Sequence, residues 1–264
     1  VSYMFQMPTA QVWKKLAEEG KLNEAQRHFW EPKPTEELYD LQTDPHEVQN
    51  LASSPAHNSV LEKLRAAHVA HMERTRDLGF IPEAERLRLA GDRSPRDVFA
   101  SDSEYPFANV FALAQKASDL SFTDTLPFVL ALGEANATLR YWAVLGLHIR
   151  KADGVKAGYN SLVKLLADPS PSVRIAAAEA LATHGPPDDL APSLDTLLAA
   201  ADPVKNGNPT ATAALTALDN LGAKAAAAKP KLSALPFKSN EGPTRLREYP
   251  TRLLKHLNGD AEKD

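Results

Sequence analysis

The chain has 264 residues, no cysteine, and a net charge of −4 from 30 basic and 34 acidic side chains. The length allows one or two domains with a buried core, and the apolar fraction of 43% is ordinary for a globular protein. The composition excludes disulfides and thiolate metal sites, and it gives no reason to expect nucleic acid or an anionic membrane as a partner. No apolar run reaches the roughly 18 residues that a membrane-spanning helix needs.

The first thirty residues predict two short helices. Thr9 can cap a helix that ends at Gly20, and Asn23 can cap a second helix that ends before Pro32. Residues 2–6, SYMFQ, are a candidate strand ahead of both.

The segment 37–52, ELYDLQTDPHEVQNLA, predicts a short strand followed by a capped helical turn. Residues 38–41 are mostly apolar and have the length of a strand. Asp44 is a good N-cap, Pro45 suits the first helical position, and Glu47 stands three residues after the cap, as in a capping box. We therefore expect a helix to begin at Pro45.

The carboxylates of this segment allow a second interpretation. Asp40, Asp44 and Glu47 are close enough in sequence to form an acid/base pair or a calcium site. Helix capping already accounts for Asp44 and Glu47, so we assign these two a structural role.

A long helix is predicted between Pro55 and Gly79, with apolar side chains on one face. That face holds Leu61, Leu64, His68, Met72 and Thr75. His68 and His71 are three residues apart, a spacing that could hold a metal ion. No third ligand is evident, so we expect His68 to be a packing residue and no metal site in this chain.

The pattern LYDL…DP.E..NLA, with its flanks at 3–30 and 76–83, resembles the C-terminal subdomain of type I sulfatases of the bacterial, heparan-N-sulfatase-like kind. The resemblance implies that residues 1–81 form an α+β subdomain remnant with one or two strands plus helices. It implies a parent enzyme that hydrolyses a sulfate ester or sulfamate of a sulfated glycan, in the periplasm or outside the cell. Because this subdomain borders the substrate cleft in the family, His28 becomes a candidate substrate contact.

The catalytic nucleophile of that family is not in this sequence. Its signature is C/S-x-P-x-R, whose Cys or Ser becomes formylglycine, and the chain has no cysteine. The two x-x-Pro-x-Arg matches, at 241–245 and 248–252, have Glu at the nucleophile position, and a carboxylate cannot be oxidised to an aldehyde. We therefore expect no catalytic residue and no cofactor here. Since Val1 is not a natural start, we expect a C-terminal part whose partner, a missing N-terminal sulfatase domain, holds the formylglycine and calcium.

Residues 82–102 predict a linker between two domains. The segment is polar and is broken by Gly91 and Pro95, and residues 83–90 can form a short helix within it.

The rest of the chain contains an internal repeat. Residues 128–147 align with 162–181 at a constant offset of 34, and a third copy begins at Asp202. Each unit reads as helix, turn, helix, and the pattern resembles HEAT repeats, whose stacked helix pairs form an α-solenoid. We expect such a solenoid over 103–258, followed by a tail at 259–264.

Two polar positions recur in these repeats. Arg140 and Arg174 lie one repeat apart, so a ladder of binding residues is conceivable. In HEAT-like units this arginine usually pairs with the aspartate of the turn. We therefore predict a structural ion pair between Asp168 and Arg174.

Taken together, the sequence predicts a mainly α protein: the non-catalytic C-terminal part of a sulfatase, joined to a helical repeat scaffold that docks a protein or a glycan. The alternative is a stand-alone HEAT-repeat interaction module without enzymatic activity. The sequence names neither the sulfated substrate nor the partner of the solenoid.

Overall fold

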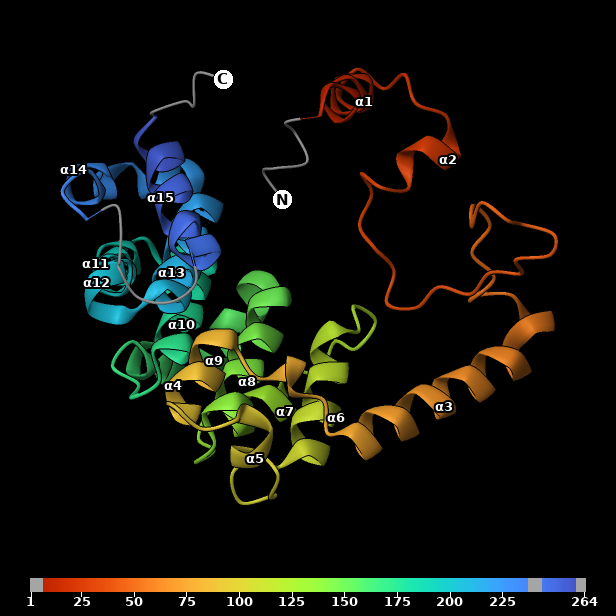
Figure 1. The fold of residues 1–264 in the computed structure, drawn as a ribbon, viewed down its shortest axis with the longest axis horizontal. Helices are drawn as coiled ribbons and strands as arrows, with labels where there is room; N and C mark the ends of the chain where they lie inside the picture. The colour runs from red at the N-terminus through yellow and green to blue at the C-terminus, as the bar shows by residue number, and fades with distance from the viewer. Residues whose placement is uncertain (1–6, 237–243, 260–264) are drawn as a thin grey trace. The chain divides into compact units, whose positions relative to one another are not determined.

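The computed structural model describes residues 7–236 and 244–259, and within these ranges the chain forms helices and turns but no strand (Figure 1). By its internal contacts the chain divides into two units, Val1–Met72 and Glu73–Asp264. This division falls before the predicted linker at 82–102. None of the described helices is both long enough and apolar enough to cross a membrane.

The first unit contains helices α1 (Pro8–Glu18), α2 (Glu24–Arg27), η2 (Pro55–His57) and most of α3 (Asn58–Thr75). Its interior is small: among its described residues, the buried apolar side chains are Ala10, Leu22, Leu38 and Leu61. The predicted Asn23 cap is present as a complete capping box with Gln26.

The predicted strand and helix of segment 37–52 do not form. Leu38 N donates to the side chain of Asn50 at 3.0 Å rather than to a neighbouring strand, and Leu51 N donates back to Leu38 O at 2.7 Å. Glu47 has a φ of 53°, which is incompatible with a helix that starts at Pro45. The α+β expectation for residues 1–81 is therefore wrong for the described residues. The candidate strand at 2–6 lies outside them.

The predicted apolar face of α3 is also wrong. Only Leu61 is buried on this helix, Leu64 is 52% exposed, and His68 lies at the surface. The helical spacing of these residues predicts one buried face, but in the structure burial on this face is complete only at Leu61, while Met72 is half-buried.

The second unit begins with a segment that packs on the repeats. It contains η3 (Leu78–Phe80), α4 (Glu83–Ala90) and α5 (Pro95–Val98), followed by α6 (Phe107–Ser118). The Phe80 ring contacts the rings of Phe107, Phe111 and Trp142, and Trp142 Nε1 donates to Phe80 O at 2.8 Å. The predicted linker thus contains two helices, and its Phe99 is 2% exposed.

The repeats follow as helix pairs. They are α7 (Leu126–Ala131) with α8 (Ala137–Ile149), α9 (Lys151–Leu165) with α10 (Pro171–His184), and α11 (Leu190–Ala200) with α13 (Asn208–Asn220). The short η4 (Pro187–Asp189) and α12 (Pro203–Asn206) occupy the turns, and η5 (Gly222–Ala228), α14 (Lys229–Leu232) and α15 (Thr244–Asn258) complete the chain. The second helices form one layer, because α8 packs on α10, α10 on α13 and α13 on α15 (Figure 1).

Caps at equivalent positions start the second helices α8 and α10. Asn136 accepts hydrogen bonds from Thr138 N and Leu139 N, and Ser170, one repeat later, accepts from Val173 N. In the third repeat Asp202 caps α12, which is the insertion ahead of α13. The 34-residue sequence repeat is therefore also a repeat of helix starts.

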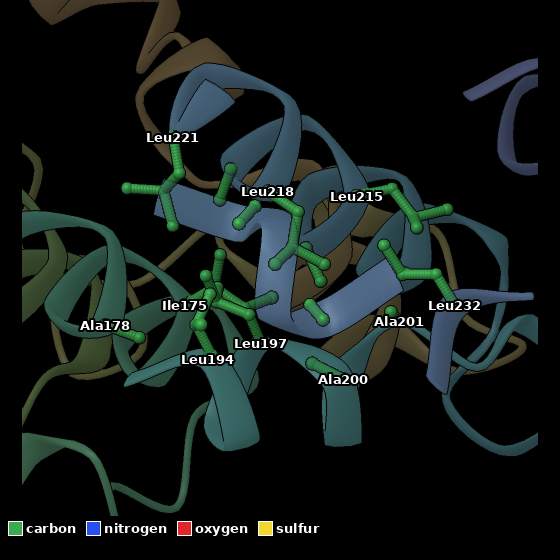
Figure 2. Close-up of a cluster of buried hydrophobic side chains, with 14 of the residues drawn as sticks. Ile175, Ala178, Leu194, Leu197, Ala200, Ala201, Leu215, Leu218, Leu221 and Leu232 are labelled. Carbon is green, nitrogen blue, oxygen red and sulfur yellow. The ribbon is translucent and has the colours of Figure 1, made fainter. Parts of the chain in front are cut away.

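Leucine and alanine side chains from several repeats share one core (Figure 2). Ile175 of α10, Leu197 of α11, and Leu215 and Leu218 of α13 are at most 5% exposed, and Leu254 of α15 is 0% exposed. The many alanines allow the helices to approach closely, so each repeat buries its apolar face against the next.

A substitution at Gly154 of α9 tests how tightly α8 and α9 are packed. A Cβ atom at this position would lie 2.1 Å from the carbonyl oxygen of Leu147, which is backbone and cannot rotate away. We expect Gly154→Ala to lower the free energy of unfolding by about 1–3 kcal/mol, despite the better helix propensity of alanine. Urea denaturation followed by circular dichroism measures this change.

Gly133→Ala is the matched control, because its Cβ would meet nothing closer than 3.8 Å. We expect it to stay within about 0.5 kcal/mol of wild type. Equal effects of the two substitutions would contradict the described packing of α9 on α8.

Candidate functional site

His28, the candidate substrate contact, follows α2 in the first unit. Its Nε2 lies 3.1 Å from Val48 O, and because a carbonyl can only accept, this nitrogen carries the proton. Its Nδ1 lies 3.8 Å from a carboxylate oxygen of Glu31, and the side chain is 45% exposed. A sulfate at His28 would therefore have to displace Glu31, whose negative charge opposes it.

Asp44 organises the loop in which the helix was predicted. Its Oδ2 accepts hydrogen bonds from Val48 N at 2.9 Å and Gln49 N at 2.8 Å. Glu47 lies between Asp44 and Val48, and its backbone is in the left-handed region, which turns the chain back toward Asp44. Asp44 thus closes a loop rather than starting a helix.

Asp168 is held by an arginine of the preceding repeat. Arg140 Nε donates to Asp168 Oδ2 at 2.7 Å and Arg140 Nη2 to Oδ1 at 2.8 Å, and the two side chains are 11% and 3% exposed. Arg174, the predicted partner, instead donates to the backbone oxygens of Asp168 and Pro169. The bidentate ion pair between Arg140 and Asp168 therefore connects successive repeats. Arg174 instead binds the backbone of the turn that precedes its own helix, α10.

A second buried carboxylate fixes α4 to the repeats. Glu85 is 1% exposed, and it accepts from Ser170 Oγ at 2.7 Å and from Arg88 Nη2 at 2.6 Å. Ser170 lies 85 residues further along the chain, so no local pattern in the sequence indicated this contact. The helix α4 also packs against α10 and α13, so it lies on the layer of second helices and borders one side of its surface.

A groove of about 480 Å³ is lined by residues of α4, α8, α10, α13 and α15, together with Pro82. Tyr141 of α8, Glu179 of α10, Thr212 of α13 and Tyr249 of α15 lie along it, with Glu83 of α4 at one side. One carboxylate oxygen of Glu179 accepts from the side chain of Asn220 at 2.8 Å. Burial, together with the charge of Glu179, raises the pKa of Tyr141, so its hydroxyl stays protonated at neutral pH. The lining residues are spread over five helices, so no single stretch of the sequence indicates this groove.

Two histidines lie at the ends of α8 and α10, and the charge of Glu179 acts on one of them, His148. The ring centroids of His148 and His184 are 5.1 Å apart, and among the described residues the buried Nδ1 of His148 has no hydrogen-bond partner. Burial lowers the pKa of His148, and the charge of Glu179 partly opposes this. Burial also lowers the pKa of His184, as do the positive charges of His148, Lys224 and Lys151.

These shifts predict a loss of stability in mild acid. A histidine whose pKa is lower in the folded state than its ordinary value of 6.5 binds protons more readily when the chain is unfolded. Its contribution is complete above pH 6.5 and is lost as the pH falls from there toward the folded value. We expect the urea midpoint to fall between pH 7.5 and pH 5.5, and the fall to be smaller in His148→Gln. His46→Gln, at an exposed position, should leave the fall unchanged.

The described residues offer no site for a metal ion. Among residues 7–236 and 244–259, no group of three or more His, Asp or Glu side chains gathers in a way that could hold one.

Comparison with known proteins gives two matches. A family model described as HEAT repeats matches residues 125–215, which agrees with the stacked helix pairs and confirms the helical-repeat part of the predicted fold. The chain is also similar to "Ulvan-active sulfatase" of Formosa agariphila, with 34% identity over 110 residues. That alignment covers 41% of this chain and 18% of the relative, so the chain spans less than a fifth of the relative's length. No solved structure matches the chain.

Proposed function

We propose that this chain is the non-catalytic C-terminal part of a sulfatase, and that its helical repeats serve that enzyme as a scaffold. The observation that carries the proposal is the 34% identity to a protein named as a sulfatase. The pattern LYDL…DP.E..NLA at 38–52 supports the same assignment. The parent enzyme would hydrolyse a sulfate ester or sulfamate of a sulfated glycan.

The groups that perform this reaction would lie outside this chain. Without cysteine, and with Glu at the nucleophile position of both x-x-Pro-x-Arg matches, the sequence offers no precursor of formylglycine. The described residues also lack a cluster of carboxylates that fits calcium. We therefore derive no catalytic step here and assign both groups to an N-terminal sulfatase domain.

Within this proposal His28 remains the candidate contact to sulfated sugar. In its doubly protonated form the exposed imidazole could donate from Nδ1 to a sulfate once Glu31 moves away, while its Nε2 stays bonded to Val48 O. Asp44 and Glu47 would shape the loop behind it.

A stand-alone interaction module is the second candidate function. It is favoured by the HEAT match at 125–215 and by a second unit that buries its apolar faces on its own helices. HEAT repeats usually mediate protein interactions. Such a module would need no catalytic domain.

The coding sequence upstream of Val1 distinguishes the sulfatase proposal from the stand-alone module. We expect it to stay open and to encode a domain that carries C/S-x-P-x-R. An in-frame stop codon immediately upstream would contradict the sulfatase proposal and support the module.

A further inference from the structure

We propose that the groove on the layer of second helices binds a peptide segment that carries a lysine or arginine side chain between apolar residues. This inference deepens the scaffold part of the proposed function, because it specifies what the repeats would hold.

The groove is built from successive second helices, so its lining belongs to more than one repeat. Tyr141 of α8, Glu179 of α10 and Thr212 of α13 line it in order, and Tyr249 of α15 lies along the same groove. Its volume of about 480 Å³ is within the range that small binding sites occupy. An extended segment could therefore contact several repeats at once.

The charged residues that line the groove are acidic, and they favour a positively charged ligand. Glu83 and Glu179 both line the groove, and none of the described lining residues is lysine, arginine or histidine. Two tyrosine rings lie with them, and an aromatic face attracts a cation. An anionic sulfated glycan would be repelled by the same carboxylates.

The remaining lining favours a peptide over a neutral sugar. Pro82, Leu145, Ile175 and Pro209 present mainly hydrocarbon to the groove. A sugar covered with hydroxyl groups would lose hydrogen bonds to water against such a surface, whereas apolar side chains gain by burial there.

The walls of the groove are fixed, which reduces the entropic cost of binding. The buried contact between Glu85 and Ser170 holds α4, and Asn220 orients the carboxylate of Glu179. Tyr249 is 43% exposed, so it remains accessible to a ligand from solvent.

The test is a selection of random, phage-displayed peptides of about twelve residues on the purified 264-residue chain. We expect the enriched peptides to carry lysine or arginine flanked by apolar residues. A synthetic copy of the most enriched peptide is then titrated by fluorescence anisotropy. Glu179→Gln, which keeps the acceptor for Asn220 but removes the charge, should weaken binding about tenfold, equivalent to about 1.4 kcal/mol. Glu134→Gln, at an exposed acidic position outside the groove, should not weaken it.

A groove-filling variant provides the second measurement. Ala213 is exposed and lines the groove, so Ala213→Trp should abolish binding while circular dichroism shows an unchanged helix content. No enrichment, enrichment of peptides without basic residues, or binding that survives both groove variants would overturn the proposal. Each of these failures would leave the sulfatase assignment intact, because the upstream reading frame tests that assignment separately.

Discussion

Replacing Arg140 with methionine should lower the free energy of unfolding by about 3–5 kcal/mol. Asp168 is buried, and its carboxylate would lose both bonds from the guanidinium, which among the described residues leaves it the one from Ser170 N. The carbonyl oxygens of Glu134 and Ala135 would lose a donor as well. Urea denaturation of the full chain, followed by circular dichroism, measures the change.

Two further variants show whether the buried charge causes this loss. Asp168→Asn should cost less in the Arg140→Met background than in wild type, because it removes the uncompensated charge while keeping an acceptor for Ser170 N. Arg252→Met removes an exposed pair with Glu248 and should cost no more than about 1 kcal/mol. If Arg252→Met destabilised the chain as much as Arg140→Met, the ion pair between repeats would not have the importance that we assign to it.

Leu218→Ala should cost about 2–5 kcal/mol. The side chain is 0% exposed in the core that α10, α11 and α13 share with α14 and α15 (Figure 2), so its removal leaves a cavity bounded by several repeats. The same urea experiment measures the loss. Leu130→Ala, at a position that is 69% exposed, is the matched control and should change stability by less than about 0.5 kcal/mol. A loss below about 1 kcal/mol for Leu218→Ala would contradict the described core.

The helical repeats could be predicted from the sequence because their signals are local. An apolar side chain every three or four residues, a capping residue at each turn and the 34-residue offset all lie within single units. Asn136 and Ser170 cap equivalent helices, as that offset requires. The domain organisation, by contrast, depends on distant partners.

The segment 82–102 illustrates this limit. Its polar residues and breaks predict a linker, but the polar side chain of Glu85 is buried because Ser170 supplies a hydrogen bond from 85 residues away. Composition cannot distinguish a polar residue at the surface from one that is buried with a partner. The boundary between the two units falls instead between Met72 and Glu73, inside α3, which the sequence predicts as one continuous helix.

The candidate sites show the same limit. The alignment of repeats placed Arg140 and Arg174 at equivalent positions, yet only the structure shows that Arg140 reaches forward to Asp168. In the segment 37–52 the capping residues predict a helix, but Glu47 has a positive φ and the chain forms a loop there. The groove residues come from five helices, so no single stretch of sequence contains their pattern.

Release of sulfate is the measurement that tests the proposed function most directly. The product of the complete reading frame that contains this sequence, supplied with calcium, should release sulfate from a sulfated polysaccharide. The 264-residue chain alone should release no more than a heat-inactivated control. Sulfate release by the 264-residue chain alone, or none by the complete product, would contradict the assignment of this chain as the non-catalytic part of a sulfatase.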